Sequence, residues 1–234
     1  RRLSIVALSS AGHQPMHSAS RRYAIAFNGA IYNHLEIKTE LHESGAVLNW
    51  RGTSDTETSL AGFDAWGIRG MVERTIGMFG LAVWDKENRI LTLARDRIEE
   101  KLVYYGWQNH GNHPTFLFGS ELKGLKAHLA FEGAINRDAL CLLRRHNYIP
   151  APYSIFKGIF KLMPGTLLTV SSNQREPIIS PYWSLTKAAE RGIEKPFIGS
   201  DHKAVDTHEH LLMDAMHKQM TADMLLEAFL SGGV

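Results

Sequence analysis

The sequence predicts an α+β fold in which helices cover antiparallel sheets. Most of its strand-like apolar runs come in pairs joined by short polar turns, such as the one at residues 85–88, and this arrangement is typical of hairpins. The helix-like stretches also come in pairs, rather than one between every two strands. Alternating βαβ units, which would build a parallel sheet, are therefore excluded, and a layered sandwich remains.

The first elements are two strands followed by a helix. The apolar runs at residues 3–8 and 23–27 are short, lie on either side of a Gly-Pro loop and are typical of strands. Asn33 and Glu36 have the spacing of a capping box, which predicts a helix start, and Gly45 can supply its left-handed stop.

A second helix is predicted from a repeat of the same spacing. Ser54 and Glu57 stand three residues apart, and apolar side chains then recur at helical intervals up to Gly67. We expect Ser54 to cap this helix and the side chain of Asp55 to point away from it.

Two hairpins follow. Residues 78–84 and 89–94 form the first predicted pair, and residues 102–105 and 115–118 form the second across the polar loop 108–113.

The second half of the chain begins with two helices, residues 122–128 and residues 137–146, the latter capped by Asn136. Residues 165–170 are predicted to be the last strand. Residues 171–205 lose periodicity and are rich in proline, so a linker is expected. Residues 207–222 then give an amphipathic helix.

Composition excludes several classes of protein. The net charge of +2 comes without a block of like charges, so neither nucleic acid nor an anionic membrane is an expected partner. No apolar run approaches the roughly 20 residues that span a bilayer. The single cysteine, Cys141, excludes an internal disulfide and favours a reducing compartment, so a cytoplasmic location is expected. We expect Cys141 to be buried in a helix.

The histidines do not predict a metal site. A pair of histidines in a loop can bind zinc, but no further ligand completes a set nearby. We expect solvated side chains at His110, His113, His202, His208 and His210.

Several short motifs occur together, in one order, along the whole chain. Two of them are predicted to be polar turns where a strand ends and a helix begins, and such turns can bind a small polar ligand through backbone N–H groups. The motifs are Arg1-Arg2-Leu3-Ser4-Ile5-Val6, Ala11-Gly12-His13-Gln14-Pro15, Phe27-Asn28-Gly29-Ala30-Ile31-Tyr32-Asn33, Ser54-Asp55-Thr56-Glu57, Arg95-Asp96-Arg97, Gly119-Ser120-Glu121-Leu122-Lys123 and Ser231-Gly232-Gly233-Val234.

With these motifs the chain resembles the glutamine-hydrolysing asparagine synthetases from residue 1 to residue 234. The resemblance implies a layered sandwich of the N-terminal-nucleophile hydrolase type with antiparallel sheets. It places a glutaminase domain, a class II glutamine amidotransferase domain truncated at its N-terminus, at residues 1–170. A linker at 171–205 and the start of a truncated asparagine synthetase domain, of the α/β ATP-pyrophosphatase type, at 206–234 would follow.

The resemblance also implies a glutamine site. Arg2 would hold the α-carboxylate of glutamine and Asp55 its α-ammonium, while Val6 would line the same site. Without the resemblance, a solvated surface arginine and a helix-capping aspartate are the simpler explanations of Arg2 and Asp55.

Catalysis would depend on Asn28 and Gly29. Amide hydrolysis passes through a tetrahedral oxyanion, and the side chain of Asn28 and the backbone N–H of Gly29 match the family's oxyanion hole. A hairpin turn without a ligand is the alternative for an Asn-Gly pair. Ala30 stands where the family has a glutamate that helps to hold the ammonium, so this glutamine site is expected to be weakened.

The family's nucleophile is an N-terminal cysteine, which this sequence does not contain. We expect the chain to be cut at both ends and to be inactive by itself. Aspartate, ATP and Mg²⁺ would act in the full-length protein, a homodimer is possible, and this chain needs no cofactor. An inactive relic with a binding or regulatory role, or an amidotransferase for another carboxylate acceptor, stays open. The residues implied in ATP binding are Leu230, Ser231, Gly232 and Gly233.

Overall fold

A computed structural model describes residues 13–45, 50–110 and 113–220. Its elements alternate between strands and helices without a repeating βαβ unit. In chain order they are β1 (Met16–His17), β2 (Tyr23–Ile31), α1 (His34–Glu43), α2 (Asp55–Arg74), β3 (Gly77–Asp85), β4 (Ile90–Arg95), β5 (Tyr104–His110), β6 (His113–Gly119), α3 (Leu122–Lys126), α4 (Arg137–His146), β7 (Phe160–Lys161), β8 (Thr166–Ser171), β9 (Ile178–Pro181), α5 (Leu185–Glu194) and α6 (Asp201–Gln219).

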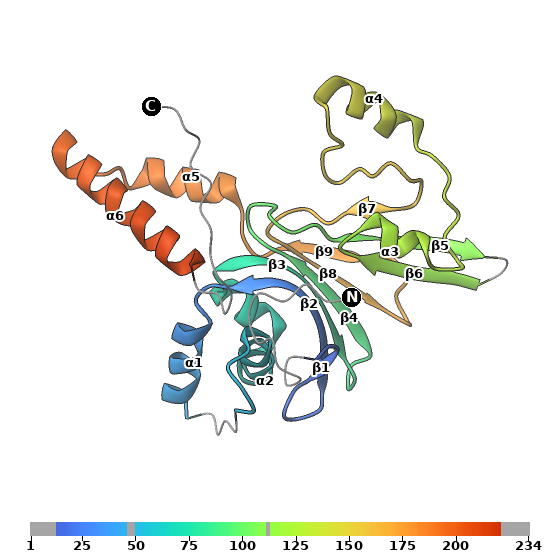
Figure 1. The fold of residues 1–234 in the computed structure, drawn as a ribbon, viewed down its shortest axis with the longest axis horizontal. Helices are drawn as coiled ribbons and strands as arrows, with labels where there is room; N and C mark the ends of the chain where they lie inside the picture. Colours follow the sequence, from blue (N-terminus) through green and yellow to red (C-terminus); the bar gives the residue numbers. More distant parts are fainter. Residues whose placement is uncertain (1–12, 46–49, 111–112, 221–234) are drawn as a thin grey trace.

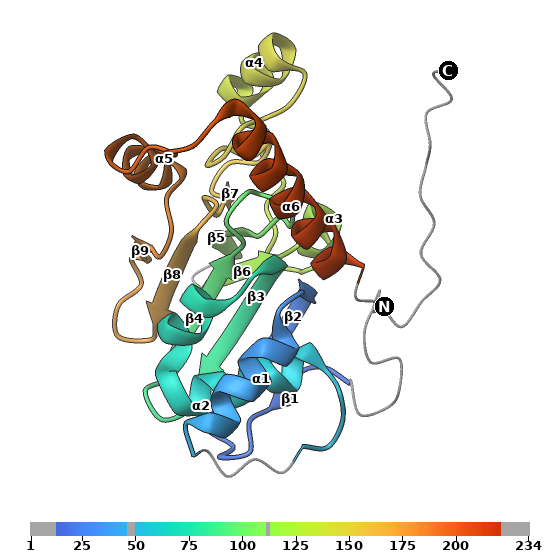
Figure 2. The same ribbon diagram turned by 90° about the vertical axis from the view of Figure 1, so that its left-hand side faces the viewer.

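The strands form two antiparallel sheets that pack face to face. The first sheet has the order β1-β2-β3-β4-β8-β9 and the second has the order β6-β5-β7. Helices α1 and α2 cover the free face of the first sheet (Figures 1 and 2). Helix α3 lies on the outer face of the second sheet, where Leu125 packs with Tyr104 and Leu117. The expected layered α+β sandwich with antiparallel sheets is thus confirmed.

Alternation of side chains along the strands builds two apolar layers. On one face of the first sheet, Ile25 packs with Phe63 of α2. On the other face, Leu93 and Leu168 pack with Tyr105 of the second sheet. Because successive residues of a strand point to opposite faces, both layers can be filled from the same strands.

Both predicted helix starts are confirmed, although the capping differs. Ser54 caps α2 by accepting a hydrogen bond from the N–H of Thr56 (3.2 Å). At α1, by contrast, the side chain of Asn33 makes no capping hydrogen bond. It bonds instead to the backbone of Arg74 and Ile76, between α2 and β3, so the predicted capping box at this helix is wrong.

Two glycines have left-handed conformations at the positions where the sequence predicted that the helices stop. Gly45 follows α1 with φ +78°, and Gly67 breaks the helical conformation inside α2 with φ +71°. Both values lie in the left-handed region that glycine enters without a steric penalty. Beyond Gly67 the chain resumes helical geometry and continues to Arg74, further than the sequence pattern predicted.

The two predicted hairpins are confirmed as β3–β4 and β5–β6. The second is longer than predicted, because β5 continues through the polar residues 108–110. Gln108 is buried there, and it is accommodated because its amide donates to the carbonyl of Lys157 and accepts from the N–H of Glu132.

The strand predicted at residues 165–170 is confirmed as β8, but the prediction that it is the last strand is wrong. Strand β9 lies inside the expected linker and pairs with β8 from Thr166 to Thr169. The prolines at 177 and 181 weakened the strand prediction for this segment. An edge strand such as β9 can nevertheless accommodate proline. Helix α5 also lies in the expected linker, so the prediction that residues 171–205 lack regular structure is wrong. The division into two domains stays a prediction.

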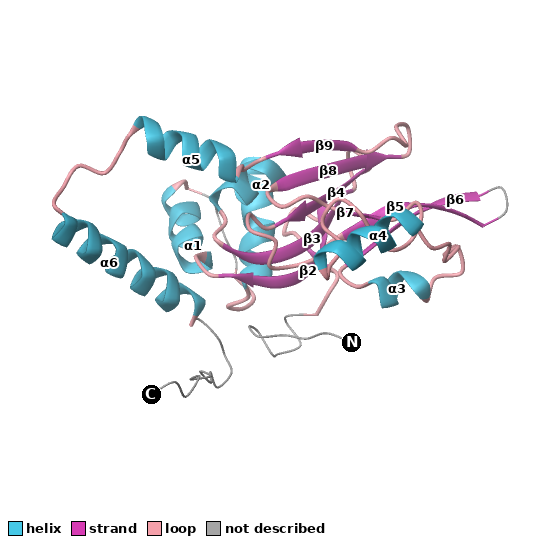
Figure 3. Ribbon diagram, turned by 90° about the horizontal axis from the view of Figure 1, so that it is seen from above, coloured by secondary structure: helices cyan, strands magenta, loops and turns pink. Residues whose placement is uncertain are grey.

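Helices α5 and α6 project from the sandwich (Figures 1 and 3) and bury none of their residues. Helix α6 begins at Asp201, earlier than predicted, because Ser200 caps it by accepting from the N–H of Lys203 (3.3 Å). No described helix is long and apolar enough to cross a membrane.

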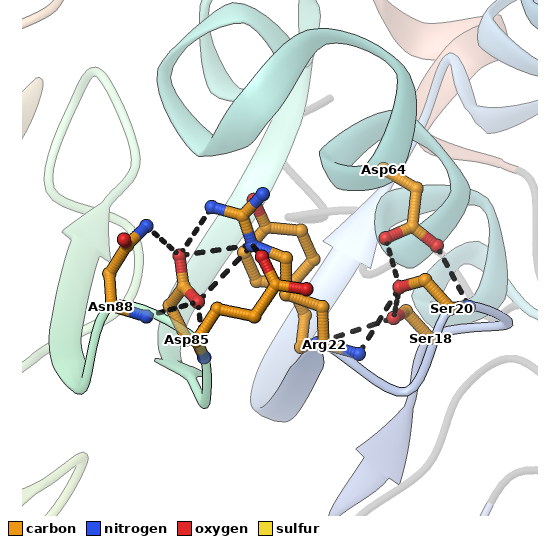
Figure 4. Close-up of polar contacts among 8 residues, drawn as sticks. Ser18, Ser20, Arg22, Asp64, Asp85 and Asn88 are labelled. Atoms are coloured by element: carbon orange, nitrogen blue, oxygen red, sulfur yellow. Dashed lines mark hydrogen bonds and ion pairs between the residues drawn. The ribbon is translucent and has the colours of Figure 1, made fainter.

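A cluster of hydrogen bonds and ion pairs connects the hairpin β3–β4 to the start of β2 (Figure 4). The guanidinium of Arg22 donates to both carboxylate oxygens of Asp85 at 2.7 to 3.2 Å. The same carboxylate accepts from the backbone N–H groups of Glu87 and Asn88. Nearby, the hydroxyl of Ser20 donates to Asp64 (2.6 Å).

This cluster predicts a specific loss of stability in acid. Burial alone would raise the pKa of Asp85, but the hydrogen bonds from Arg22 and Asn88 outweigh it and hold the pKa at about 2, below the ordinary 3.8. The resulting stabilisation of about 2 kcal/mol is present above pH 4 and is lost as the pH falls through 2. We expect Asp85→Asn to lose this stabilisation at pH 7. Urea denaturation between pH 7 and pH 2.5 would measure it.

Glu87→Gln is the matched control, since Glu87 also contacts Arg22 (3.3 Å) but is largely exposed. We expect a change below about 1 kcal/mol from it. Equal losses in the two variants would contradict the proposed role of the buried carboxylate.

Candidate functional site

The Asn28-Gly29 pair lies inside strand β2, so the predicted turn is wrong. Asn28 pairs with Gly80 and Gly29 with Phe79 of β3. Gly29 adopts φ +154°, and a Cβ atom added to it would lie 2.0 Å from the carbonyl oxygen of Met78. This position therefore requires glycine because β2 and β3 approach each other closely, not because the chain reverses direction there.

Asn28 is exposed and lines a cavity of about 160 Å³ at the edge of the space between the two sheets. The cavity is open and has mostly apolar walls from both sheets. Its lining residues are Gln14, Ala26, Phe27, Asn28, Gly80, Leu81, Ala82, Leu93, Val103, Phe118, Gly119 and Ser120.

Gln14 enters this cavity just before β1. Its side-chain oxygen Oε1 accepts a hydrogen bond from the backbone N–H of Phe27 (2.7 Å). The neighbouring residue in the chain, Pro15, has no N–H to offer to β2. The side chain of Gln14 thus continues the pairing of β2 on the N-terminal side of β1.

Asp55 lies at the start of α2, beside the end of β2. Its Oδ2 accepts from the backbone N–H of Ile31 (3.1 Å), and its Oδ1 accepts from the N–H of Thr56 (2.7 Å). Only 4% of Asp55 is exposed. This burial raises the pKa of Asp55, although the two backbone N–H groups and nearby His34 oppose the shift. The sequence predicted that the side chain of Asp55 points away from the helix. This is wrong, because its Oδ1 accepts from the N–H of Thr56 in the first turn of α2.

His34 is a buried residue of this region that sequence analysis did not select. Its Nδ1 lies 2.9 Å from the carbonyl oxygen of Ile31, so Nδ1 carries the proton and donates. Asp55 and His34 therefore hold the N–H and the C=O of the same residue, and they fix the end of β2. In the sequence, the only indication that His34 belongs to this site was its position directly after the motif that ends in Tyr32-Asn33.

The structure tests only part of the predicted glutamine site. Arg2 and Val6 lie outside the described residues, as do Leu230, Ser231, Gly232 and Gly233 at the other end. Of the described candidates, Asn28 lines the cavity, whereas Asp55 of α2 contacts Ile31. Ile31 lies three residues further along β2 than Asn28, roughly 10 Å away at the usual strand rise. Ala30, between them, is only 4% exposed.

Cys141 is exposed, so its predicted burial is wrong. Helix α4 buries only Ala139, and its apolar side chains Leu140 and Leu143 are themselves partly exposed. Cys141 also does not line the cavity of Asn28.

Among the described residues, no group of three His, Cys, Asp or Glu side chains could hold a metal ion. His202, His208 and His210 are exposed on α6, as expected. The side chains of His110 and His113 lie outside the described part.

The family model described as a glutamine amidotransferase domain matches residues 1–183. The chain belongs to this family. The match covers both sheets of the sandwich, the cavity and Asp55. It ends two residues after β9, so β9 belongs with the glutamine amidotransferase domain in sequence as well as in the sheet.

Similar proteins include a putative asparagine synthetase [glutamine-hydrolyzing] 2 of Methanocaldococcus jannaschii, with 34% identity over 100% of this chain and 45% of that protein. Asparagine synthetase [glutamine-hydrolyzing] 3 of Bacillus subtilis is 31% identical over 100% of this chain and 36% of that protein. The chain thus spans less than half the length of these curated relatives. A solved structure of the allosteric regulatory enzyme of purine biosynthesis matches 73% of this chain and 31% of that chain, with a TM-score of 0.49 and 16% identity.

Proposed function

We propose that this chain supplies the glutamine-hydrolysing part of an enzyme that makes asparagine from aspartate, glutamine and ATP. The observation that supports this most is the arrangement along β2. A side-chain amide, Asn28, faces an open cavity, and a buried carboxylate, Asp55, is fixed at the end of the same strand. A glutamine molecule carries a carboxamide at one end and an ammonium at the other, which match these two groups.

The proposed chemistry needs a thiol and an oxyanion hole. The thiol gives up its proton as its sulfur adds to the carboxamide carbon of glutamine. The amide nitrogen takes up this proton and leaves as ammonia, and water then hydrolyses the thioester to glutamate and regenerates the thiol. The amide of Asn28 and the N–H of Gly29 would stabilise the oxyanion. The thiol would come from residues that precede Arg1, since the exposed Cys141 does not line the cavity.

Arg2, Val6 and Asp55 would bind the amino-acid end of glutamine. In the second reaction, aspartate and ATP would form an acyl-adenylate and pyrophosphate, and ammonia would displace AMP to give asparagine. Residues 230–233 would contribute to ATP binding there, with Mg²⁺ accompanying the nucleotide. We also propose that the protein is cytoplasmic and that two copies can associate.

An isotope experiment tests this function in the whole gene product. Amide-¹⁵N glutamine, aspartate, ATP and Mg²⁺ are supplied, and the label is followed by mass spectrometry. We expect ¹⁵N in the side chain of asparagine, with one AMP and one pyrophosphate for each asparagine. Labelled ammonia without asparagine would point to another carboxylate acceptor.

The second candidate is an inactive amidotransferase relic, and Ala30 favours it. Where the family has a glutamate, this chain has a buried alanine that offers no acceptor for the substrate ammonium. One such charge-assisted hydrogen bond is worth about 1.5–3 kcal/mol, so its loss weakens binding by roughly one to two orders of magnitude. A gene product that binds glutamine but releases no glutamate would support this candidate.

Asp55→Asn should weaken binding and also lower stability. We expect glutamine binding to fall at least about tenfold, because a neutral amide attracts the ammonium less than a carboxylate does. The free energy of unfolding at pH 7 should fall by about 1–3 kcal/mol, because the single amide oxygen can accept from only one of the buried N–H groups of Ile31 and Thr56. Calorimetry and urea denaturation would measure the two effects.

The pH dependence has a definite sign. Because burial raises the pKa of Asp55, protonation favours the folded state, and this stabilisation is lost as the pH rises through the folded-state pKa. Relative to Asp55→Asn, the wild type should therefore gain stability as the pH is lowered. Asp138→Asn, at an exposed aspartate in the first turn of α4, is the control and should change neither binding nor this difference.

A further inference from the structure

The cavity next to Asn28 contains few groups that can recognise a polar ligand. Its walls are formed mainly by alanine, leucine, valine, phenylalanine and glycine residues. Three polar side chains interrupt them: Asn28 from β2, Ser120 after β6, and Gln14 before β1. A polar ligand in such a site must obtain its orientation from these few groups.

The orientation of the Gln14 amide follows from its hydrogen bond to the main chain. The N–H of Phe27 can only donate, so the atom 2.7 Å from it must be the oxygen Oε1. The amino group Nε2 is consequently on the other side of the amide. Among residues 13–45, 50–110 and 113–220, no hydrogen bond engages this Nε2.

Completing the pairing of β2 does not require the amino group of Gln14. A glutamate would offer the same oxygen to Phe27 without the amino group, but it would place a second, charged oxygen at the cavity wall. Because Gln14 lines the cavity and its Oε1 is held by Phe27, its amino group adds a donor to those of Asn28 and Ser120.

We propose that Gln14 is a substrate-binding residue whose Nε2 donates a hydrogen bond to the carboxamide oxygen of bound glutamine. This inference rests on the proposed function, and it adds a side chain from the segment before β1 to the carboxamide end of the site. The oxygen would then accept from Gln14 as well as from Asn28, and apolar walls would exclude water from the methylene groups. Because Oε1 is held by Phe27, the donor needs no reorganisation when the ligand binds.

Two substitutions separate the two ends of the amide. Gln14→Glu keeps an oxygen for the N–H of Phe27 but removes the amino group. Gln14→Met keeps the length of the side chain and removes both. Calorimetry with glutamine should show at least about fivefold weaker binding for both variants, the effect of one lost hydrogen bond. The melting temperature should fall clearly only for Gln14→Met. Gln174→Glu makes the same chemical change on an exposed loop residue and should alter neither quantity.

Unchanged or tighter glutamine binding by Gln14→Glu would overturn the inference, and tighter binding would place the ammonium of glutamine there instead. If the wild type bound no glutamine, the proposed function would be wrong, and acetamide, which carries the carboxamide alone, would decide the role of Gln14. We expect acetamide to shift the side-chain NH₂ resonances of Gln14 in the nuclear magnetic resonance spectrum. No shift at saturating acetamide would also overturn the inference.

Discussion

Asp96→Ala is expected to lower the free energy of unfolding by about 4 kcal/mol, which corresponds to a fall of about 10 °C in melting temperature. The carboxylate of Asp96 is fully buried and is the acceptor around which the loop after β4 is folded. Alanine would leave its donors buried without a partner, at about 1–3 kcal/mol for each one that water cannot reach. The donors are the backbone N–H groups of Phe79 (3.3 Å), Ile98 (3.2 Å), Glu100 (2.9 Å) and Lys101 (2.8 Å).

Asp64→Ala is the control for this prediction. Asp64 also accepts two hydrogen bonds, both from Ser20, but it is exposed and water can replace it. We expect a loss of at most about 1 kcal/mol. Thermal denaturation followed by circular dichroism would compare the variants, and a melting temperature of Asp96→Ala within about 2 °C of the wild type would contradict our interpretation of the loop.

The sequence was sufficient to predict the layers of the fold, because local signals and packing agree there. The hairpin β3–β4 has apolar strands and a polar turn, and α4 begins at Arg137 after Asn136, whose side chain accepts from Asp138 and Ala139. Strand β9 could not be predicted from local pattern. Its pairing with β8 is a long-range contact, and its own residues carry only a weak strand signal.

The candidate site was harder to predict, since it depends on how distant segments meet. Asn-Gly is the strongest short signal for a hairpin turn, but the pairing of Gly29 with Phe79 extends β2 through it. The burial of Asp55 follows from the approach of α2 to β2, which no local pattern contains. Gln14 and His34 likewise gain their significance only from the backbone groups that they contact.

Gly29→Ala is expected to cost about 4 kcal/mol or more of folding free energy and to abolish glutamine binding. An added Cβ would lie 2.0 Å from the carbonyl oxygen of Met78 and 2.7 Å from the Cα of Phe79, and both of these are backbone atoms that cannot rotate away. The φ of +154° adds strain for any residue with a side chain. Strands β2 and β3 would have to separate at the position where Asn28 faces the cavity.

Gly124→Ala provides the matched control, because a Cβ at this position in α3 meets nothing within 4 Å. Alanine is the better helix former, so this variant should be as stable as the wild type or up to about 1 kcal/mol more stable. Circular dichroism would give the melting temperatures, and calorimetry with glutamine would give the affinities. A Gly29→Ala protein that melted with the wild type would show that β2 and β3 can part at this point without loss. One that remained folded but bound no glutamine would show that the close approach of the strands serves the site more than the fold.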